Sequence, residues 1–321
     1  MSLRQRYELR PFAELHRNPG KFAMTEASRQ TISYLSQRLR DVGIEPNHRH
    51  GQNFLVDLNI LDLIADRAAI EPDDVCLEVG CGTGSLTSRL AARAAHVVSV
   101  EIDPRMHQIA SEELAAFSNV TLLRIDALQS KHEIAPEIAA ALDEHLAGTS
   151  RRLLLVANLP YHVATPLLVN LLVWKFVPGS MTVTIQKEVA ERLLAAPSTH
   201  AYGALSVFVQ AVADVEMLRV LPPSVFWPKP KVDSAVVQIL PRDAKRRRIA
   251  DIPAFQEFLR AAFAHRRKML RGVLASSLPP GFDRQRLDAV LQQMGVPATA
   301  RAEEVDVETW IRLFDALRSP A

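Results

Sequence analysis

One stretch near residue 80 gives the strongest indication of the fold and reads Val75-Cys76-Leu77-Glu78-Val79-Gly80-Cys81-Gly82-Thr83-Gly84-Ser85-Leu86-Thr87. Its first part is a short apolar run that predicts a buried strand, and the apolar positions that begin at Leu86 predict a helix. The glycines between them stand at alternate positions, which lets the backbone turn tightly and approach a ligand closely. The stretch therefore predicts a strand, a ligand-binding turn and a helix, in that order.

The same alternation continues along the chain. Strands are predicted at Val75–Val79, Val97–Ile102, Val120–Ile125, Leu153–Ala157, Thr182–Gln186 and Ala235–Leu240. Helices are predicted from Leu58 to Ala68 and at Leu86–Ala94, Pro104–Phe117 and Thr165–Trp174. Short β-rich runs that alternate with helices favour a parallel sheet. The predicted fold class is therefore α/β, with a Rossmann-like, doubly wound sheet.

The two ends of the chain differ from this middle part. Near the N-terminus, Ile32, Leu35, Leu39 and Val42 repeat at helical spacing, which predicts a short amphipathic helix packed on the main body or, alternatively, binding a partner. After Pro241 the strand pattern stops, and three helical stripes follow. The predicted organisation is an N-terminal extension (1–50), a sheet domain (51–242) and a small helical domain (243–321).

The composition indicates an ordinary globular protein, with 321 residues, of which 48% are hydrophobic and 23% charged. No apolar run has membrane-spanning length, and the N-terminus, which is charged early at Arg4 and Arg6, lacks the apolar h-region of a signal peptide. The two cysteines, Cys76 and Cys81, have no clustered histidines, so neither a zinc site nor a disulfide framework is expected. A reduced, cytoplasmic location without a membrane partner follows.

Positive charge is concentrated in residues 243–278, which carry nine Lys or Arg residues against three acidic residues. The candidates for RNA binding are Arg246, Arg247, Arg248, Arg266, Arg267 and Lys268. Blocks of this kind often bind nucleic acid. The alternative is a solvated linker or helix face.

Two acidic residues stand at the ends of the next predicted strands. Glu101 can accept hydrogen bonds from both hydroxyls of a ribose. Asp126, after the following strand, is suitably placed to accept one from an adenine amino group. Together with the glycine loop, these acids fit S-adenosylmethionine.

Each of these signals also has a simpler interpretation. A Gly-x-Gly-x-Gly sequence alone fits dinucleotide binders or a tight turn, and Asp126 could be a helix N-cap. Two details argue against NAD. The acid precedes the glycines, as Glu78, and Ser85 stands where Gly-x-Gly-x-x-Gly requires its third glycine.

The quartet Asn158-Leu159-Pro160-Tyr161 follows a predicted strand, where open α/β sheets bind ligands. The exocyclic amine of adenine is a poor nucleophile because its lone pair is delocalised into the ring. The Asn158 side-chain oxygen and the Leu159 carbonyl can accept both amine protons and favour a more tetrahedral nitrogen. Pro160 stiffens the turn, and Tyr161 can stack on the base. A strand-ending turn that uses Asn and Pro for backbone reasons is the alternative.

With these motifs the chain resembles the ribosomal RNA adenine N6-dimethyltransferases, in particular their small-subunit, KsgA-type branch. The resemblance extends from Gly51 to about Leu274. Its motifs, besides the glycine loop, Glu101, Asp126 and the quartet, are Gly51–Leu55, Gln186–Arg192, Tyr202–Val207, Phe226–Ala235 and Phe263–Lys268. The chain departs from the family at 47–50, which read Asn-His-Arg-His, at Cys81, where proline is usual, and in its long N-terminus.

The resemblance implies a role for each matching residue. The cofactor S-adenosylmethionine is expected at Asn53, Leu55, Gly80, Gly82, Glu101, Asp126 and Asn158. Catalysis is expected at Asn158, Leu159 and Tyr161, with Phe226 covering the second face of a flipped adenine. The family methylates two adjacent adenines near the 3′ end of small-subunit rRNA, on an immature small ribosomal subunit. No metal is needed, and nothing in the sequence demands a dimer.

The expected chemistry is in-line displacement of a methyl group from a sulfonium by the N6 amine, in which placement contributes much of the catalysis. Two rival functions stay open at this stage. One is the large-subunit rRNA adenine methylase of the macrolide-resistance type, which shares the fold and the quartet. The other is a non-enzymatic assembly factor or nucleic-acid binder on the same fold.

Overall fold

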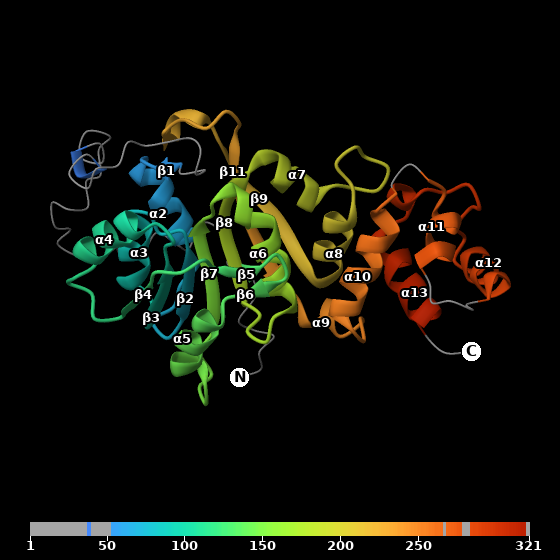
Figure 1. Ribbon diagram of the computed structural model, residues 1–321, viewed down its shortest axis with the longest axis horizontal. Coiled ribbons are helices and arrows are strands. Elements are labelled where there is room, and N and C mark those ends of the chain that lie inside the picture. The colour runs from blue at the N-terminus through green and yellow to red at the C-terminus, as the bar shows by residue number, and fades with distance from the viewer. Residues whose placement is uncertain (1–36, 40–52, 266–267, 278–282, 319–321) are drawn as a thin grey trace, which may run out of the picture.

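The computed structural model describes residues 37–39, 53–265, 268–277 and 283–318. Its centre is a seven-stranded sheet in the order β4-β3-β2-β7-β8-β11-β9 (Figure 1). The strands are β2 (Val75–Val79), β3 (His96–Val100), β4 (Val120–Leu123), β7 (Leu153–Asn158), β8 (Ser180–Gln186), β9 (Ala213–Leu221) and β11 (Ser234–Pro241). The first five in spatial order are parallel, whereas β11 is antiparallel to both β8 and β9.

Helices cover both faces of the sheet. Successive side chains of a strand point to opposite faces, and the strands carry apolar residues on both faces, which the helices bury. One face carries Val75 and Leu77 and packs against α5 (Pro136–Leu146), α6 (Tyr161–Val173), α7 (Lys187–Leu194) and α8 (Ala204–Val212). The other face carries Cys76 and Val156 and packs against α2 (Leu58–Arg67) and α3 (Ser85–Ala91). Helix α4 (Pro104–Glu113) follows β3. The predicted α/β class with a Rossmann-like sheet is confirmed.

Strand β9 and helix α5 were not expected from the sequence. Strand β9 follows α8 directly, at Ala213, without a glycine or proline to mark the change. It is an edge strand with exposed charged residues, including Asp214 and Glu216. These charges interrupt the apolar run by which a strand is recognised in a sequence. The expected parallel sheet is found in five strands, and the departure from it is β11, which runs antiparallel to both of its neighbours.

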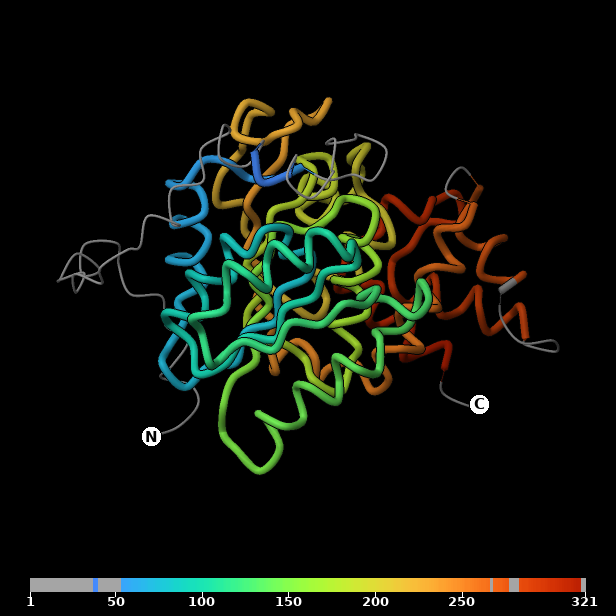
Figure 2. Tube along the Cα trace, turned by 60° about the vertical axis from the view of Figure 1, so that its left-hand side comes forward, coloured from blue at the N-terminus to red at the C-terminus, as the bar shows by residue number. Residues whose placement is uncertain are grey.

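The C-terminal segment forms α9 (Asp243–Arg246), α10 (Ile252–Phe263), α11 (Leu270–Ser277), α12 (Arg284–Gln293) and α13 (Val307–Arg318). Figures 1 and 2 show these helices on the side of the sheet away from α2. One continuous hydrophobic cluster joins Leu155 of the sheet to Phe255 and Trp310 of this segment. The division of the chain at residues 242 and 243 stays a prediction.

Of the N-terminal extension, the structure describes residues 37–39, which are helical. The Leu39 side chain is 0% exposed and packs with Met106 and Ile109 of α4. Arg38 forms an ion pair with Glu112 at 2.5 Å. The other three members of the predicted stripe, Ile32, Leu35 and Val42, lie outside the described residues.

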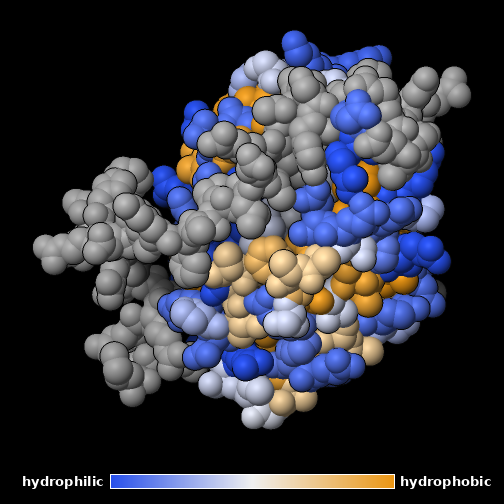
Figure 3. Space-filling model, turned by 90° about the vertical axis from the view of Figure 1, so that its left-hand side faces the viewer, coloured by the Kyte–Doolittle hydropathy of each residue, from blue (hydrophilic) through white to orange (hydrophobic). Residues whose placement is uncertain are grey.

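Polar and apolar side chains are interspersed on the face that carries α4, as Figure 3 shows. In the described part of the chain, no helix is both long and apolar enough to cross a membrane.

Candidate functional site

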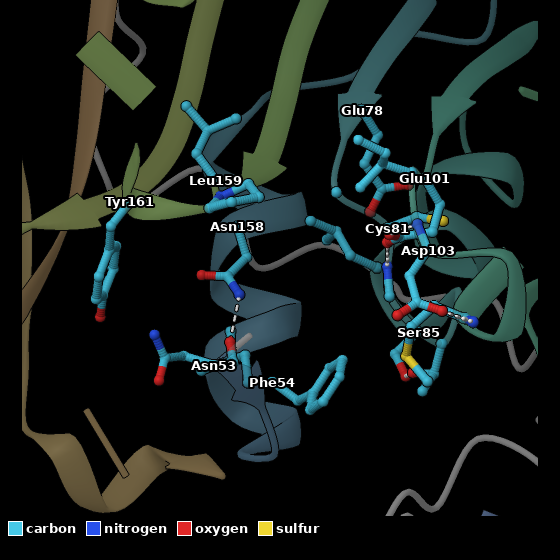
Figure 4. A pocket seen from close by; sticks show the side chains of 18 of the residues that line it. Asn53, Phe54, Glu78, Cys81, Ser85, Glu101, Asp103, Asn158, Leu159 and Tyr161 are labelled. Atoms are coloured by element: carbon cyan, nitrogen blue, oxygen red, sulfur yellow. Dashed lines mark hydrogen bonds between the residues drawn. The ribbon is translucent and has the colours of Figure 1, made fainter. Parts of the chain in front are cut away.

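A cavity of about 750 Å³ lies at the carboxyl ends of β2, β3 and β7. Most of its wall is built from three parts of the chain, which Figure 4 shows from close by. They are the segment Asn53–Leu55, the glycine loop with Glu101 and Asp103, and the quartet Asn158–Tyr161. The structure therefore brings together most of the residues that the sequence motifs predicted for the cofactor and for catalysis.

The glycines of the loop have left-handed backbone conformations, with φ values of 78° at Gly80, 57° at Gly82 and 83° at Gly84. A Cβ atom at Gly80 would lie 2.8 Å from Cγ and Cδ of Pro160. A Cβ atom at Gly82 would lie 3.1 Å from the ring of Phe54. Glycine is required here because the other two parts of the cavity wall pack directly on the loop.

Glu78 lines the cavity, although the sequence motifs suggested no role for it. Its Oε2 atom accepts hydrogen bonds from Thr87 at 2.6 Å and Ser99 at 3.0 Å. Burial raises its pKa to about 7, although the two hydroxyl groups favour the charged form. An acid directly before a glycine loop was the available signal, and it was used only as an argument against NAD.

Glu101 directly follows β3 and contacts the same glycine loop. Its Oε2 accepts from the Gly82 N–H at 2.9 Å and its Oε1 from the Asp103 N–H at 3.0 Å. Burial raises the pKa of Glu101, against the effect of these backbone donors. Next to it, the Ile102 side chain is 61% exposed and also lines the cavity.

Asp126 is the one predicted cofactor residue that does not line the cavity. It follows β4, is exposed, and accepts a hydrogen bond from the Leu128 N–H at 3.0 Å. Its position after the third parallel strand agrees with the expected order. A contact to adenine by this carboxylate stays a prediction.

The quartet begins in the last residue of β7. The Asn158 side-chain nitrogen donates to the carbonyl of Asn53 at 3.0 Å, so the side-chain oxygen is left to accept other hydrogen bonds. Figure 4 shows this oxygen pointing to the side of Tyr161. The Leu159 N–H donates to the carbonyl of Thr184 in β8 at 3.1 Å, which fixes the turn to the sheet.

Tyr161 begins α6 and lines the cavity with a partly buried ring. Its hydroxyl group lies 2.7 Å from the Oγ atom of Ser234, the first residue of β11. Burial raises the pKa of Tyr161 and so disfavours the phenolate. Ser234 belongs to the motif Phe226–Ala235, but no signal in the sequence indicated a contact with the quartet.

The Phe226 side chain is 1% exposed and does not line the cavity. It belongs to β10 (Phe226–Trp227), which pairs with β1 (Phe54–Leu55), so that Phe226 lies opposite Leu55. The Val56 N–H also donates to the Val225 carbonyl at 3.0 Å. In this arrangement Phe226 anchors the ribbon that carries Asn53, and stacking on a base would require the ring to leave its cluster.

The first part of the basic block, in α9, lies at the end of the sheet opposite the cavity. Strand β11 runs toward the amino end of β8, so α9 stands at the opposite edge of the sheet (Figure 1). Arg246 is half-buried and donates to the carbonyl of Leu172 at 2.7 Å, and Arg248 forms an ion pair with Glu308. Arg247 is exposed, with 76% of its side chain accessible. Arg266 and Arg267 lie outside the described residues, and Lys268 is exposed.

Known proteins are similar to this chain over most of its length. The sequence family described as ribosomal RNA adenine dimethylase matches residues 44–319. The ribosomal RNA small subunit methyltransferase A of Geobacillus kaustophilus is 40% identical over 268 residues, 83% of this chain and 89% of that protein. The protein of the same name from Bacillus mycoides is 40% identical over 270 residues, with the same coverage of both proteins.

Two solved structures are also similar. The crystal structure of a dimethyladenosine transferase from Plasmodium falciparum has a TM-score of 0.65 and 25% identity, and covers 80% of this chain and 94% of that one. The crystal structure of the 23S rRNA methyltransferase ErmE has a TM-score of 0.58 and 26% identity, and covers 83% of this chain and 100% of that one. The match therefore includes both the sheet and most of the remaining chain.

Proposed function

The chain belongs to the ribosomal RNA adenine dimethylase family, and from this membership we propose that it transfers two methyl groups to each of two adjacent adenines near the 3′ end of small-subunit rRNA. The methyl donor in this proposal is S-adenosylmethionine. The family expected from the sequence motifs is thereby confirmed. The relatives with 40% identity are small-subunit methyltransferases by name, which supports that substrate here.

One observation carries the chemical part of the proposal. The Asn158 nitrogen is engaged with the Asn53 carbonyl, which turns the side-chain oxygen toward Tyr161 at the end of the cavity. An acceptor oxygen beside an aromatic ring is the arrangement needed to hold an adenine N6 amine. The Leu159 carbonyl is the proposed second acceptor.

The cavity suits the cationic methyl donor. Glu78 and Glu101 both line it, and burial raises the pKa of each in the ligand-free protein. A positively charged ligand nearby would lower these pKa values again and would be attracted by the carboxylates. Glu101 is the proposed contact to the ribose, and Asp126 to the adenine of the donor. Asn53, Leu55, Gly80, Gly82 and Asn158 complete the proposed site. When bound, S-adenosylmethionine supplies a methyl group on its sulfonium.

The residues of this chain would then act by placement. Asn158 and Leu159 accept the two N–H groups of the amine, and Tyr161 stacks on the unstacked base. Leu159 and Tyr161 must also leave room for one methyl group, because a monomethylated amine reacts in the second round. No strong base is needed before attack, since the nitrogen becomes acidic as its new bond forms. Phe226 stays a candidate for the second stacking face.

The proposed macromolecular partner is the maturing small ribosomal subunit in the cytoplasm, bound by a monomer without a metal. Arg247 and Lys268 are exposed and can contact RNA phosphates. Arg248, Arg266 and Arg267 are kept as candidates of the same kind. For Arg246 a direct RNA contact is disfavoured because its guanidinium group already caps a helix carbonyl.

Labelled S-adenosylmethionine tests the proposal when it is incubated with unmethylated small and large ribosomal subunits in parallel. Dimethyladenine in the small subunit alone is the expected result. Modification of the large subunit instead would favour the macrolide-resistance type of methylase, to which the similarity with ErmE points. Absence of transfer to either subunit, with intact subunit binding, would favour a non-enzymatic assembly factor.

A further inference from the structure

We propose that Ser234 is a positioning residue for the methyl transfer, because its hydroxyl group holds the ring of Tyr161 at the orientation that an incoming adenine requires. The inference rests on the proposed function. It concerns a residue that lies 73 positions from Tyr161 in the sequence and outside the cavity wall.

Ser234 is held rigidly as the first residue of β11, a strand with a neighbour on each side. It is 0% exposed and lies between two strands, opposite Gln186 of β8 and Leu221 of β9. A side chain with a single rotatable torsion on a strand paired on both sides has little freedom. Its Oγ atom is therefore a fixed point at the carboxyl edge of β8.

Tyr161, in contrast, needs such a fixed point. Its backbone stands at the first position of α6, where the chain leaves the Pro160 turn, and its ring is only partly buried. Packing alone leaves one side of the ring facing the cavity. The hydrogen bond of 2.7 Å to Ser234 ties the far end of the ring, so that both ends of the side chain are held.

Loss of this hydrogen bond should affect the rate of methyl transfer more than the binding of the methyl donor. A tilted ring still excludes water and still contacts a base, but it displaces the N6 amine relative to Asn158. Misplacement of a nucleophile lowers the rate of an in-line displacement strongly. The second methylation is the more sensitive step, because a monomethylated amine has less room to adjust.

The test compares Ser234→Ala, Tyr161→Phe and the double variant, with Thr182→Val as the matched control. Thr182 is also 0% exposed, and its hydroxyl has no hydrogen-bond partner within the described part of the chain. Each variant is assayed with unmethylated small subunits and labelled S-adenosylmethionine. The measurements are kcat, KM for the subunit, Kd for S-adenosylmethionine by calorimetry, and the ratio of monomethyladenine to dimethyladenine.

Loss of one hydrogen bond predicts a decrease in kcat of about fivefold to tenfold for each single variant. The double variant should be no slower than either single one, because both remove the same bond. The Kd for S-adenosylmethionine should stay within about twofold of wild type, the monomethyl fraction should rise, and Thr182→Val should match wild type.

Three outcomes would overturn the inference. They are a wild-type kcat for Ser234→Ala, effects that multiply in the double variant, and a slow Thr182→Val control, which would show that any buried hydroxyl matters. If the wild-type protein itself transfers no methyl group, the proposed function fails instead, and the two failures are thus distinguishable.

Discussion

Gly80 and Pro160 are in direct contact, although one belongs to the glycine loop and the other to the quartet. A Cβ atom at position 80 would lie 2.8 Å from two carbon atoms of the proline ring. The proposed cofactor site and the proposed base site thus share one wall, and the space between them is set by the absence of a side chain.

Replacing Gly80 by alanine should therefore disturb both functions. The new methyl group collides with Pro160, and the φ value of 78° is itself unfavourable for alanine by roughly 1–2 kcal/mol. We expect affinity for S-adenosylmethionine to fall at least tenfold, measured by calorimetry. Gly148→Ala is the control, because Gly148 has a φ value of 69° but nothing within 4 Å of its would-be Cβ atom. Equal loss of affinity in both variants would mean that backbone strain, and not the contact, is responsible.

Asn158→Ala should abolish methyl transfer, because the side-chain oxygen that accepts the amine proton is removed. The binding of S-adenosylmethionine should change little, since Glu78, Glu101 and the glycine loop remain. Transfer of labelled methyl groups and calorimetric titration measure the two properties separately. Turnover near the wild-type rate would contradict the role assigned to Asn158.

Glu78 predicts a pH dependence of stability in the ligand-free protein. Its pKa in the folded state is about 7, against an ordinary value of 4.5, because burial disfavours the carboxylate. At a pH between these two pKa values, Glu78 is ionised in the unfolded chain but keeps its proton in the folded protein. The free energy of unfolding therefore falls as the pH rises. The loss is about 3 kcal/mol at most and is complete above pH 7.

Urea unfolding of wild type and Glu78→Gln at pH 5 and pH 8 measures this effect. The variant should lack most of the decrease contributed by Glu78, and its advantage over wild type should grow with pH. A difference between the two proteins that is independent of pH would show that Glu78 does not titrate in this range.

Leu39→Ala should weaken the binding of S-adenosylmethionine even though Leu39 is outside the cavity. Leu39 packs in one cluster with Met106 and with Phe54, both of which line the cavity. We expect a decrease in affinity of about threefold to tenfold. Leu287→Ala in α12 is the matched control, because Leu287 is 1% exposed and belongs to a different cluster. Unchanged affinity in Leu39→Ala would limit the segment to a role in stability.

Arg246 and Arg247 should differ although they are adjacent. Arg246→Gln removes a half-buried donor to the Leu172 carbonyl, so the free energy of unfolding should fall by about 1 kcal/mol. Arg247→Gln should leave stability unchanged and, if Arg247 contacts RNA, should reduce the salt dependence of subunit binding. Unfolding curves and binding titrations at several salt concentrations separate the two effects. An unchanged salt slope for Arg247→Gln would identify this block as a solvated linker.

The amino-acid sequence alone was sufficient to predict six of the seven strands of the central sheet, the glycine loop and the quartet. These are local features, since apolar runs of strand length, left-handed glycines and an Asn-Leu-Pro-Tyr turn depend mainly on neighbours in the chain. Glu101 and Asn158 could be assigned to strand ends for this reason, and the structure finds both at the cavity.

The residues from distant parts of the chain that support this site became visible in three dimensions alone. Strand β9 was hidden because an edge strand carries charges, and charge density gives no information about the end of the sheet at which α9 lies. The contacts of Ser234 with Tyr161, of the Asn53 carbonyl with Asn158 and of Pro160 with Gly80 join segments far apart in the sequence. Such contacts follow from the order and direction of the strands in space, which local patterning does not specify.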